Sequence, residues 1–231
     1  MTINVNGKVD RTLHGGEAVQ PACAGLPAMQ MSIEIKLDKE TFLQLEQQAS
    51  EPYNRFAYRD HEQFDMIRRF LFERGLCEFC PPFGRVLIDD GRVVAMMACL
   101  STEDLVRCRL LVALALSQLD SFRQDKALQQ RLWLARRILI KPQPGDFYLA
   151  RIAIVNSMRR RGIGRYLLGQ CESEARKCGC RRVILEVDPG NDSAVSLYRK
   201  ACLQDGAVCS VTDPETGRSL KYLHMAKTLQ T

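Results

Sequence analysis

The chain has 231 residues, of which 46% are hydrophobic and 26% charged, and its formal net charge is +6 at pH 7. This composition excludes overall disorder and is typical of one large globular domain or two small ones. No apolar run approaches the length of a membrane span, and the N-terminal stretch MTINVNGKVD lacks the pattern of a secretory signal. We therefore expect a cytoplasmic protein that does not act at a membrane.

Ten cysteines are present, and in a reducing cytosol we expect them to be free thiols that fill apolar space. Cys77 with Cys80, and Cys178 with Cys180, could together supply four thiolates to zinc. The second pair is spaced more tightly than zinc sites favour, and about 100 residues separate the two pairs. The sequence therefore favours no metal site.

The first half of the chain predicts two helices and three strands. Residues 1–30 show little periodicity and are expected to be a disordered leader, with Met29 or Met31 as an alternative start of translation. The alternation in 32–37 predicts a half-buried strand. The predicted elements that follow are a helix over 39–50 capped by Asp38, a helix over 61–74 between Asp60 and Gly75, and a hairpin of 85–90 and 92–100 around Asp90 and Gly91.

The segment 102–145 predicts a pair of helices inserted between the third and fourth strands. Ser101 and Asp104 resemble a capping box at its start, and the run 141–145, KPQPG, ends it. Its apolar residues at helical spacing are expected to face the core. The insertion could cover an acceptor site or form a homodimer surface.

The second half predicts alternating strands and helices. The predicted strands are 146–155, 181–187, 206–212 and 219–228, and the predicted helices are 162–177 and 193–202. The order over the whole chain is that of a mixed α/β fold with one strand–helix–strand crossover.

The stretch 158–168, MRRRGIGRYLL, lies between a predicted strand and a predicted helix. Free backbone N–H groups and the helix dipole favour an anion there, and Gly162 and Gly164 would let a phosphate approach the backbone. A solvated basic helix end is disfavoured, because each cation there opposes the dipole by about 0.3–1 kcal/mol. An ATP-binding P-loop is excluded, because no Gly-Lys-Ser/Thr follows.

Two motifs resemble those of the GCN5-related N-acetyltransferases (GNAT). The stretch IAIVNSMRRRGIGRYLL is similar to the family's acetyl-CoA motif, with its positions at Arg159, Gly162 and Gly164. The stretch LEVDPGNDSAVSLYRK is similar to a second element, at Asn191, Ala194, Leu197 and Tyr198. The resemblance covers 147–203 and implies the GNAT fold, a mixed central sheet flanked by helices, over 31–231.

One departure concerns the residues after Tyr198. The family commonly continues with lysine, any residue, glycine and phenylalanine, whereas Lys200 here is followed by Ala201, Cys202 and Leu203. We expect the turn after this helix to differ in shape.

The resemblance also implies acetyl-CoA as cosubstrate and a set of residues that bind it. Backbone groups of Ile152, Ala153 and Ile154 would pair with the pantetheine arm, and Asn191 would contact the cofactor. Tyr198 would protonate the departing thiolate, a role that suits a tyrosine hydroxyl. The pyrophosphate would be held by the backbone of Arg159, Arg160, Arg161, Gly162, Ile163, Gly164 and Arg165.

Glu186 is the preferred general base. Its setting resembles the LEV…N…A…LY pattern of ribosomal-protein N-terminal acetyltransferases, and its apolar strand neighbours would raise its pKa by desolvation. The alternative is a solvent-facing glutamate, in which case Tyr148, Asp146 or a water chain would serve. Trp133 could contact the acceptor, although core packing is its default interpretation.

The expected function is direct transfer of an acetyl group from acetyl-CoA to a primary amine. The acceptor stays open between a protein N-terminus, a lysine and a small amine. Two alternatives belong to other classes: a non-catalytic CoA-binding regulatory module, and an RNA-binding protein that uses the arginine cluster. Nucleic acid is the less favoured partner, because the positive charge is confined to one short motif.

Overall fold

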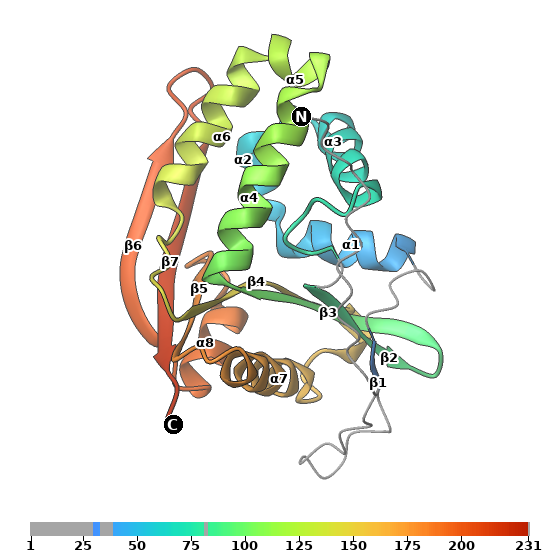
Figure 1. Ribbon diagram of the computed structural model, residues 1–231, viewed down its shortest axis with the longest axis vertical. Coiled ribbons are helices and arrows are strands. Elements are labelled where there is room, and N and C mark those ends of the chain that lie inside the picture. Colours follow the sequence, from blue (N-terminus) through green and yellow to red (C-terminus); the bar gives the residue numbers. More distant parts are fainter. Residues whose placement is uncertain (1–29, 33–38, 81–82, 231) are drawn as a thin grey trace, which may run out of the picture.

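The computed structural model describes residues 30–32, 39–80 and 83–230. The expected leader, Asp38 and most of the expected strand 32–37 lie outside these residues. The described chain forms a seven-stranded sheet with helices on both faces (Figure 1). None of the described helices is long and apolar enough to cross a membrane.

The strands and helices alternate much as the sequence predicts. The strands are β1 (Gln30–Ser32), β2 (Gly84–Asp89), β3 (Arg92–Ser101), β4 (Asp146–Ile154), β5 (Arg182–Val187), β6 (Gln204–Thr212) and β7 (Ser219–Thr228). The helices are α1 (Lys39–Ala49), α2 (Glu51–Ala57), α3 (His61–Glu73), α4 (Thr102–Ser117), α5 (Asp120–Gln124), α6 (Lys126–Ile138), α7 (Ile163–Lys177) and α8 (Asp192–Lys200). Neither α2 nor α5 was predicted, because each is too short to show helical periodicity.

The strand order is β1-β2-β3-β4-β5-β7-β6, and every neighbouring pair is antiparallel except β4 and β5. These two parallel strands are joined by α7, which is the predicted crossover. The mixed α/β fold is therefore confirmed.

The sheet splits between β4 and β5. β4 pairs with β3 from Phe147 to Ile154, but it pairs with β5 only from Asp146 to Tyr148. The rest of β5, through Val187, pairs with β7 alone. Among the described strands, the β5-facing edge of β4 is consequently without a partner after Tyr148.

Strand β3 is buried on both faces, as a continuous apolar run predicts. Met97 and Cys99 pack in the layer of α7 and α8, whereas Met96 and Ala98 pack in the layer of α1 and α3. Figure 1 shows α7 and α8 on one side of the sheet and α1 to α6 on the other.

The predicted hairpin turn and the predicted caps of two helices have the expected geometry. Asp90 and Gly91 both have positive φ, at 50° and 72°, which is the requirement of a tight hairpin turn. Asp60 caps α3 by accepting a hydrogen bond from the Gln63 N–H, and Ser101 caps α4 through the Asp104 N–H.

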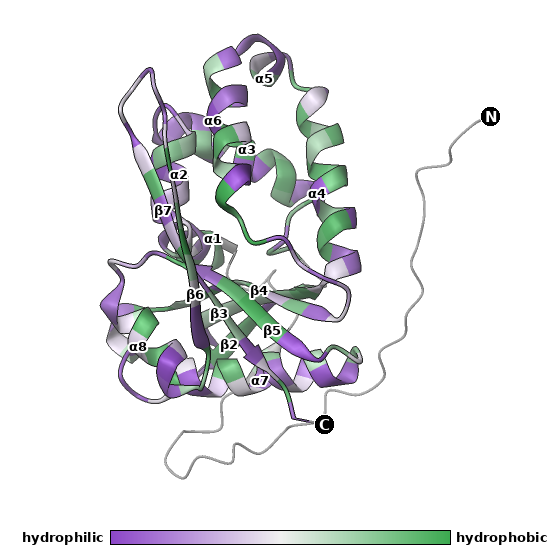
Figure 2. Ribbon diagram, turned by 90° about the vertical axis from the view of Figure 1, so that its left-hand side faces the viewer, coloured by the Kyte–Doolittle hydropathy of each residue, from purple (hydrophilic) through white to green (hydrophobic). Residues whose placement is uncertain are grey.

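The segment between β3 and β4 contains three helices, where the sequence predicts two. Helix α6 packs against α2 and the β6–β7 hairpin in an apolar cluster of Phe56, Ala57, Leu134, Ala135, Ile138 and Leu220. The outward face of α4 is also apolar, since Val106, Leu110 and Leu114 are more than half exposed. Figure 2 shows this hydrophobic character along most of α4.

The cysteine prediction needs a correction. Cys77 and Cys80 form a disulfide in the loop between α3 and β2, so these two are not free thiols. The short loop brings the two side chains together. Because they are bonded to each other, they cannot form a metal site with Cys178 and Cys180. No cluster of potential metal ligands occurs among the residues that the structure describes.

The turn after α8 has the geometry of a common helix-ending motif, although it contains no glycine. The Cys202 N–H donates to the Arg199 carbonyl and the Leu203 N–H to the Tyr198 carbonyl, both at 3.0 Å, which is a Schellman motif. Cys202 has a φ of 66°, the left-handed conformation that glycine adopts without strain. The expected difference in turn shape from the family stays a prediction, and in this chain the residue at the left-handed position is a strained Cys202.

We expect Cys202→Gly to stabilise the protein by about 1 kcal/mol, because left-handed backbone costs a non-glycine residue about 1–2 kcal/mol. In a protein of this length the melting temperature would rise by about 2–4 °C. Cys178→Gly is a matched control, since Cys178 is also exposed at a helix end but has a φ of −82°. A melting temperature lowered by both substitutions would contradict the prediction.

Candidate active site

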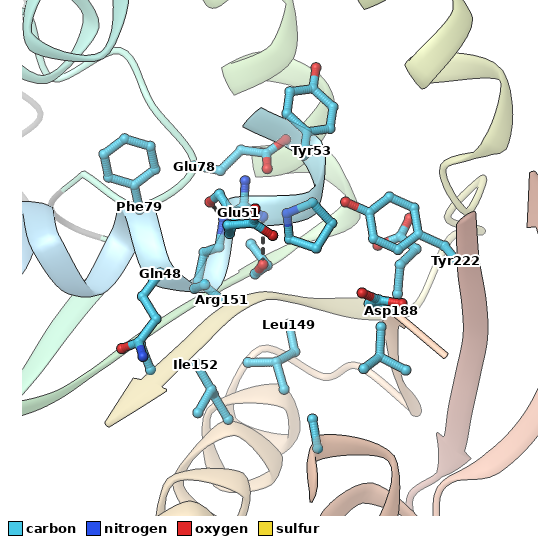
Figure 3. Close-up of a pocket in the computed structure, with 18 of the residues that line it drawn as sticks. Gln48, Glu51, Tyr53, Glu78, Phe79, Leu149, Arg151, Ile152, Asp188 and Tyr222 are labelled. Atoms are coloured by element: carbon cyan, nitrogen blue, oxygen red, sulfur yellow. Dashed lines mark hydrogen bonds between the residues drawn. The ribbon is translucent and has the colours of Figure 1, made fainter. Parts of the chain in front are cut away.

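A cavity of about 940 Å³ passes through the split in the sheet. One wall comes from β4, α7 and α8, and the other comes from the α1–α2 junction, the loop after α3, and helices α4 to α6. Figure 3 shows the two sides: Tyr53 and Glu78 lie on one side of β4, and Leu149 and Ile152 on the other. A single cavity therefore connects the two helical layers through the gap between β4 and β5.

The arginine–glycine loop lies at one end of this cavity. Arg160 and Gly162 have φ values of 63° and 85°, so the backbone turns sharply before α7 begins at Ile163. No side chain caps α7, which leaves the first N–H groups of the helix without intrahelical or capping partners. An uncapped helix N-terminus on a cavity is an anion site. A left-handed arginine is strained, as residues at functional sites often are.

The four arginines of the motif do not all face the cavity. Arg159, Arg160 and Arg165 line it, whereas Arg161 is exposed and does not. The Arg159 Nε donates to the Ile154 carbonyl at 3.2 Å, so this side chain folds back over the end of β4. Three arginines thus lie around the helix N-terminus, and binding of a pyrophosphate by the backbone of Arg161 stays a prediction.

The two glycines have different reasons for lacking a side chain. A Cβ atom at Gly162 would enter open space, so only its positive φ requires glycine. A Cβ atom at Gly164 would lie 2.8 Å from Leu197 Cδ2, so this glycine allows α7 and α8 to pack closely. Gly164 lines the cavity, whereas Ile163 does not and is buried in the core.

The unpaired edge of β4 continues the cavity from the loop. Ile152, Ala153 and Ile154 line it, and their other edge is occupied by β3. A peptide edge without a neighbouring strand can hydrogen-bond an extended amide chain, as in strand addition.

Asn191 has a structural function that the sequence did not predict. It is the N-cap of α8, and its side-chain oxygen accepts a hydrogen bond from the Ala194 N–H at 3.1 Å. It also lines the cavity. A contact between Asn191 and a cofactor stays a prediction, and the cap is a second reason for asparagine here.

Tyr198 and Glu186 line the same cavity. Tyr198 extends from α8 into the core beside Cys171, and burial raises its pKa to about 12, so the hydroxyl holds its proton at neutral pH. The structure thus places a protonated phenol and a carboxylate in one space, which is what acid–base chemistry needs.

Glu186 is held at the split by groups from two other elements. The Ile140 N–H, just beyond α6, donates to Glu186 Oε1 at 2.5 Å, and the Tyr148 hydroxyl also bonds this carboxylate. Burial raises the pKa of Glu186 above its ordinary value, while the Tyr148 and Ile140 hydrogen bonds and the Arg109 charge oppose the shift. The Glu186 side chain is therefore half-buried and hydrogen-bonded, and its role as the base stays a prediction.

The end of α6 is fixed directly opposite Glu186. His224 is the cross-strand neighbour of Glu186 on β7, and its Nε2 hydrogen-bonds the Ile138 carbonyl at 2.7 Å. Ile138 lies two residues before Ile140. The inserted helices therefore form part of the site, because their last residues position the carboxylate.

Sequence reasoning missed a group of polar residues that line the same cavity as Glu186. Arg109 of α4 donates to Glu78 Oε1 at 2.9 Å and lies 5.4 Å from the centre of the Tyr148 ring. Arg151 of β4 donates to Ser50 Oγ at 2.6 Å. Tyr53 and Tyr222 complete the group. These residues come from separate elements, so no local motif could reveal them.

The structure also bears on the predictions for Asp146 and Trp133. Asp146 is not an alternative base: both its oxygens pair with Arg182, at 2.7 and 2.8 Å, and it does not line the cavity. Trp133 is not a core residue, since its side chain is 59% exposed and lines the cavity. A tryptophan that is both exposed and part of the lining lies at the cavity mouth.

Comparisons with known proteins agree with this architecture. A sequence model described as the acetyltransferase (GNAT) family matches residues 40–202. One solved structure described as an acetyltransferase has a TM-score of 0.54 and 18% identity, over 87% of this chain and 99% of the other. No curated protein sequence matches the chain.

Two further solved structures are ribosomal-protein-alanine N-acetyltransferases. The one from Escherichia coli, described as a ribosomal-protein-S18-alanine N-acetyltransferase, has a TM-score of 0.48 and 16% identity over 88% of this chain and 95% of the other. The one from Brucella melitensis has a TM-score of 0.47 and 18% identity over 87% and 99%.

Proposed function

The chain belongs to the acetyltransferase (GNAT) family, and on that premise we propose that it transfers an acetyl group directly from acetyl-CoA to a primary amine. The observation that supports this most is the single cavity that joins the uncapped N-terminus of α7 to Glu186 through the split sheet. A module that only binds the cofactor would not need a buried carboxylate and a buried phenol in that space.

The residues present fit acetyl-CoA. The diphosphate requires N–H donors and positive charge, which the start of α7 and Arg159, Arg160 and Arg165 provide. The amide groups of the pantetheine arm require a peptide edge without a neighbouring strand, which β4 provides after Tyr148, although the Ile154 carbonyl accepts a hydrogen bond from Arg159. When bound, acetyl-CoA supplies an activated thioester, whose carbon–sulfur bond breaks as the carbon–nitrogen bond to the amine forms.

The chain's own groups handle the protons. Glu186 accepts the proton that the amine must lose, and its raised pKa makes it a stronger base than an exposed glutamate. Tyr198 donates its hydroxyl proton to the departing sulfur. The Tyr198 side chain is buried and that of Glu186 is half-buried, so bulk water competes less for these proton transfers than at an exposed site.

Release of free thiol tests this function directly. With acetyl-CoA and a panel of primary amines, we expect thiol release that depends on the amine and an acetylated product detected by mass spectrometry. Acetyl-CoA binding with no turnover on any amine, peptide N-terminus or lysine would favour the non-catalytic module instead.

A further inference from the structure

The part of the cavity beneath the inserted helices is not used by the proton transfers. On that side the inserted helices contribute a mainly apolar lining, which faces Leu71 of α3 and Phe79 of the following loop. We call this space the insertion chamber. Its apolar residues from α4, α5 and α6 are Val112, Ala113, Leu116, Phe122, Leu132 and Trp133, and Arg109, Gln129 and Arg136 of the same helices also line the cavity.

Two carboxylates without ion pairs lie where the chamber meets the split. Glu186 and Asp188 are two residues apart on one face of the chain at the end of β5, and both line the cavity. Neither forms a salt bridge with any residue that the structure describes. Glu78, by contrast, is neutralised by Arg109 at 2.9 Å. An ammonium group would therefore be attracted to Glu186 and Asp188.

For an amine seated at this carboxylate pair, the insertion chamber is the apolar space on the same side of β4. Helices α2 and α6 pack with β7 in one apolar cluster, and the loop that carries Phe79 contains the Cys77–Cys80 disulfide. Figure 3 shows Tyr53, Glu78 and Phe79 together on the chamber side of β4. The remaining body of the acceptor must then lie against Val112, Leu116 and their neighbours.

We propose that the acceptor is a small primary amine with an apolar alkyl or aryl body, which the insertion chamber buries. This inference rests on the proposed function and names its substrate class. The chamber is enclosed on several sides by packed helices, which suits a small molecule better than a peptide chain with polar amides. Burial of apolar surface then determines specificity, and the carboxylate pair orients the nitrogen.

Rates with a series of linear alkylamines from methylamine to hexylamine test directly whether the chamber buries the apolar body of the amine. Each added methylene that enters the chamber is expected to raise kcat/KM about fourfold, which corresponds to about 0.8 kcal/mol per buried CH₂. The diamine putrescine, whose second ammonium would enter apolar surroundings, is expected to be a much poorer substrate than hexylamine. A flat series, or a peptide N-terminus preferred over hexylamine, would overturn the proposal.

Substitutions on α4 provide a matched pair. Val112→Ser makes the chamber wall polar, and we expect it to lower kcat/KM for hexylamine about tenfold with little change for methylamine. Leu110→Ser is the control. It changes a residue of the same helix, but Leu110 is 61% exposed and does not line the cavity. Equal effects of the two variants on hexylamine would contradict a role of the chamber.

Binding can be observed without catalysis. Trp133 is the one tryptophan in the chain, and it lies at the chamber mouth, so its fluorescence reports occupancy. We expect hexylamine to change the emission in a saturable way and methylamine to have no effect at the same concentration. If acetyl-CoA neither binds nor is consumed, the proposed function fails; if it is consumed without preference for apolar amines, only this inference fails.

Discussion

Glu186→Gln is expected to reduce kcat/KM for acetyl transfer by about 10²–10⁴-fold, the usual contribution of a positioned general base. Glutamine has nearly the same shape, and its carbonyl oxygen can still accept the hydrogen bond from the Ile140 N–H. The variant removes the proton acceptor and leaves the cavity intact. Steady-state thiol release, with acetyl-CoA affinity measured separately, distinguishes lost chemistry from lost binding.

The dependence of the acetyl-transfer rate on pH is a second test of Glu186→Gln. The base must be deprotonated, so the rate should rise with pH through the pKa of Glu186, which burial places above that of an ordinary glutamate. The groups around it are Tyr148, Arg109, Glu78, Tyr222 and His224. Glu186→Gln should abolish this acidic limb.

Asp188→Asn is the matched comparison for Glu186→Gln. It removes a carboxylate from the same strand end and the same cavity, and we expect a loss below tenfold with the acidic limb retained. Equal losses in the two variants would show that negative charge in general, and not proton transfer to Glu186, supports catalysis.

Tyr198→Phe is expected to lower kcat by about 10²-fold or more, because the leaving sulfur then lacks its proton donor. Phenylalanine fills the same buried space, so folding and acetyl-CoA affinity should change little. The phenol, with a pKa of about 12, is protonated across the neutral range, so its loss should lower the rate at every pH near 7.

Tyr166→Phe is the control for Tyr198→Phe. Tyr166 lies on α7, is half-buried and does not line the cavity, so this variant should turn over as the unaltered protein does. Unchanged turnover in Tyr198→Phe would remove Tyr198 from the mechanism.

The fold and the geometry of the arginine–glycine loop could be predicted because their signals are local in sequence. The turn at Asp90 and Gly91, the cap at Asp60 and the apolar strand before the arginine–glycine loop each act within a few residues. The same is true of Gly162, whose positive φ follows from its place before α7. A sequence pattern confined to a few residues predicts the backbone conformation of those residues.

The acceptor half could not be predicted in the same way. The contact of Ile140 with Glu186 spans 46 residues, and that of Arg109 with Glu78 spans 31, so no pattern in the sequence indicates either. Trp133 was misassigned because helical spacing does not distinguish a core face from a cavity face. Both faces are apolar, and only the placement of α4 and α6 over the split separates them.

Some residues have structural functions that their motif conceals. Asn191 caps α8, and Gly164 allows Leu197 to approach α7. Cys202 occupies the left-handed position of a helix-ending turn that the motif assigns to glycine. In each case the backbone conformation or the packing, and not the chemistry of a ligand, explains the residue.

Calorimetric titration of the full chain with acetyl-CoA tests the central claim, that the start of α7 and the free edge of β4 bind this cofactor through its diphosphate and pantetheine arm. We expect saturable binding at one site per chain, with a raised melting temperature in acetyl-CoA and no comparable rise in ATP or RNA. No heat and no thermal shift with acetyl-CoA, together with salt-sensitive binding of RNA, would contradict the account.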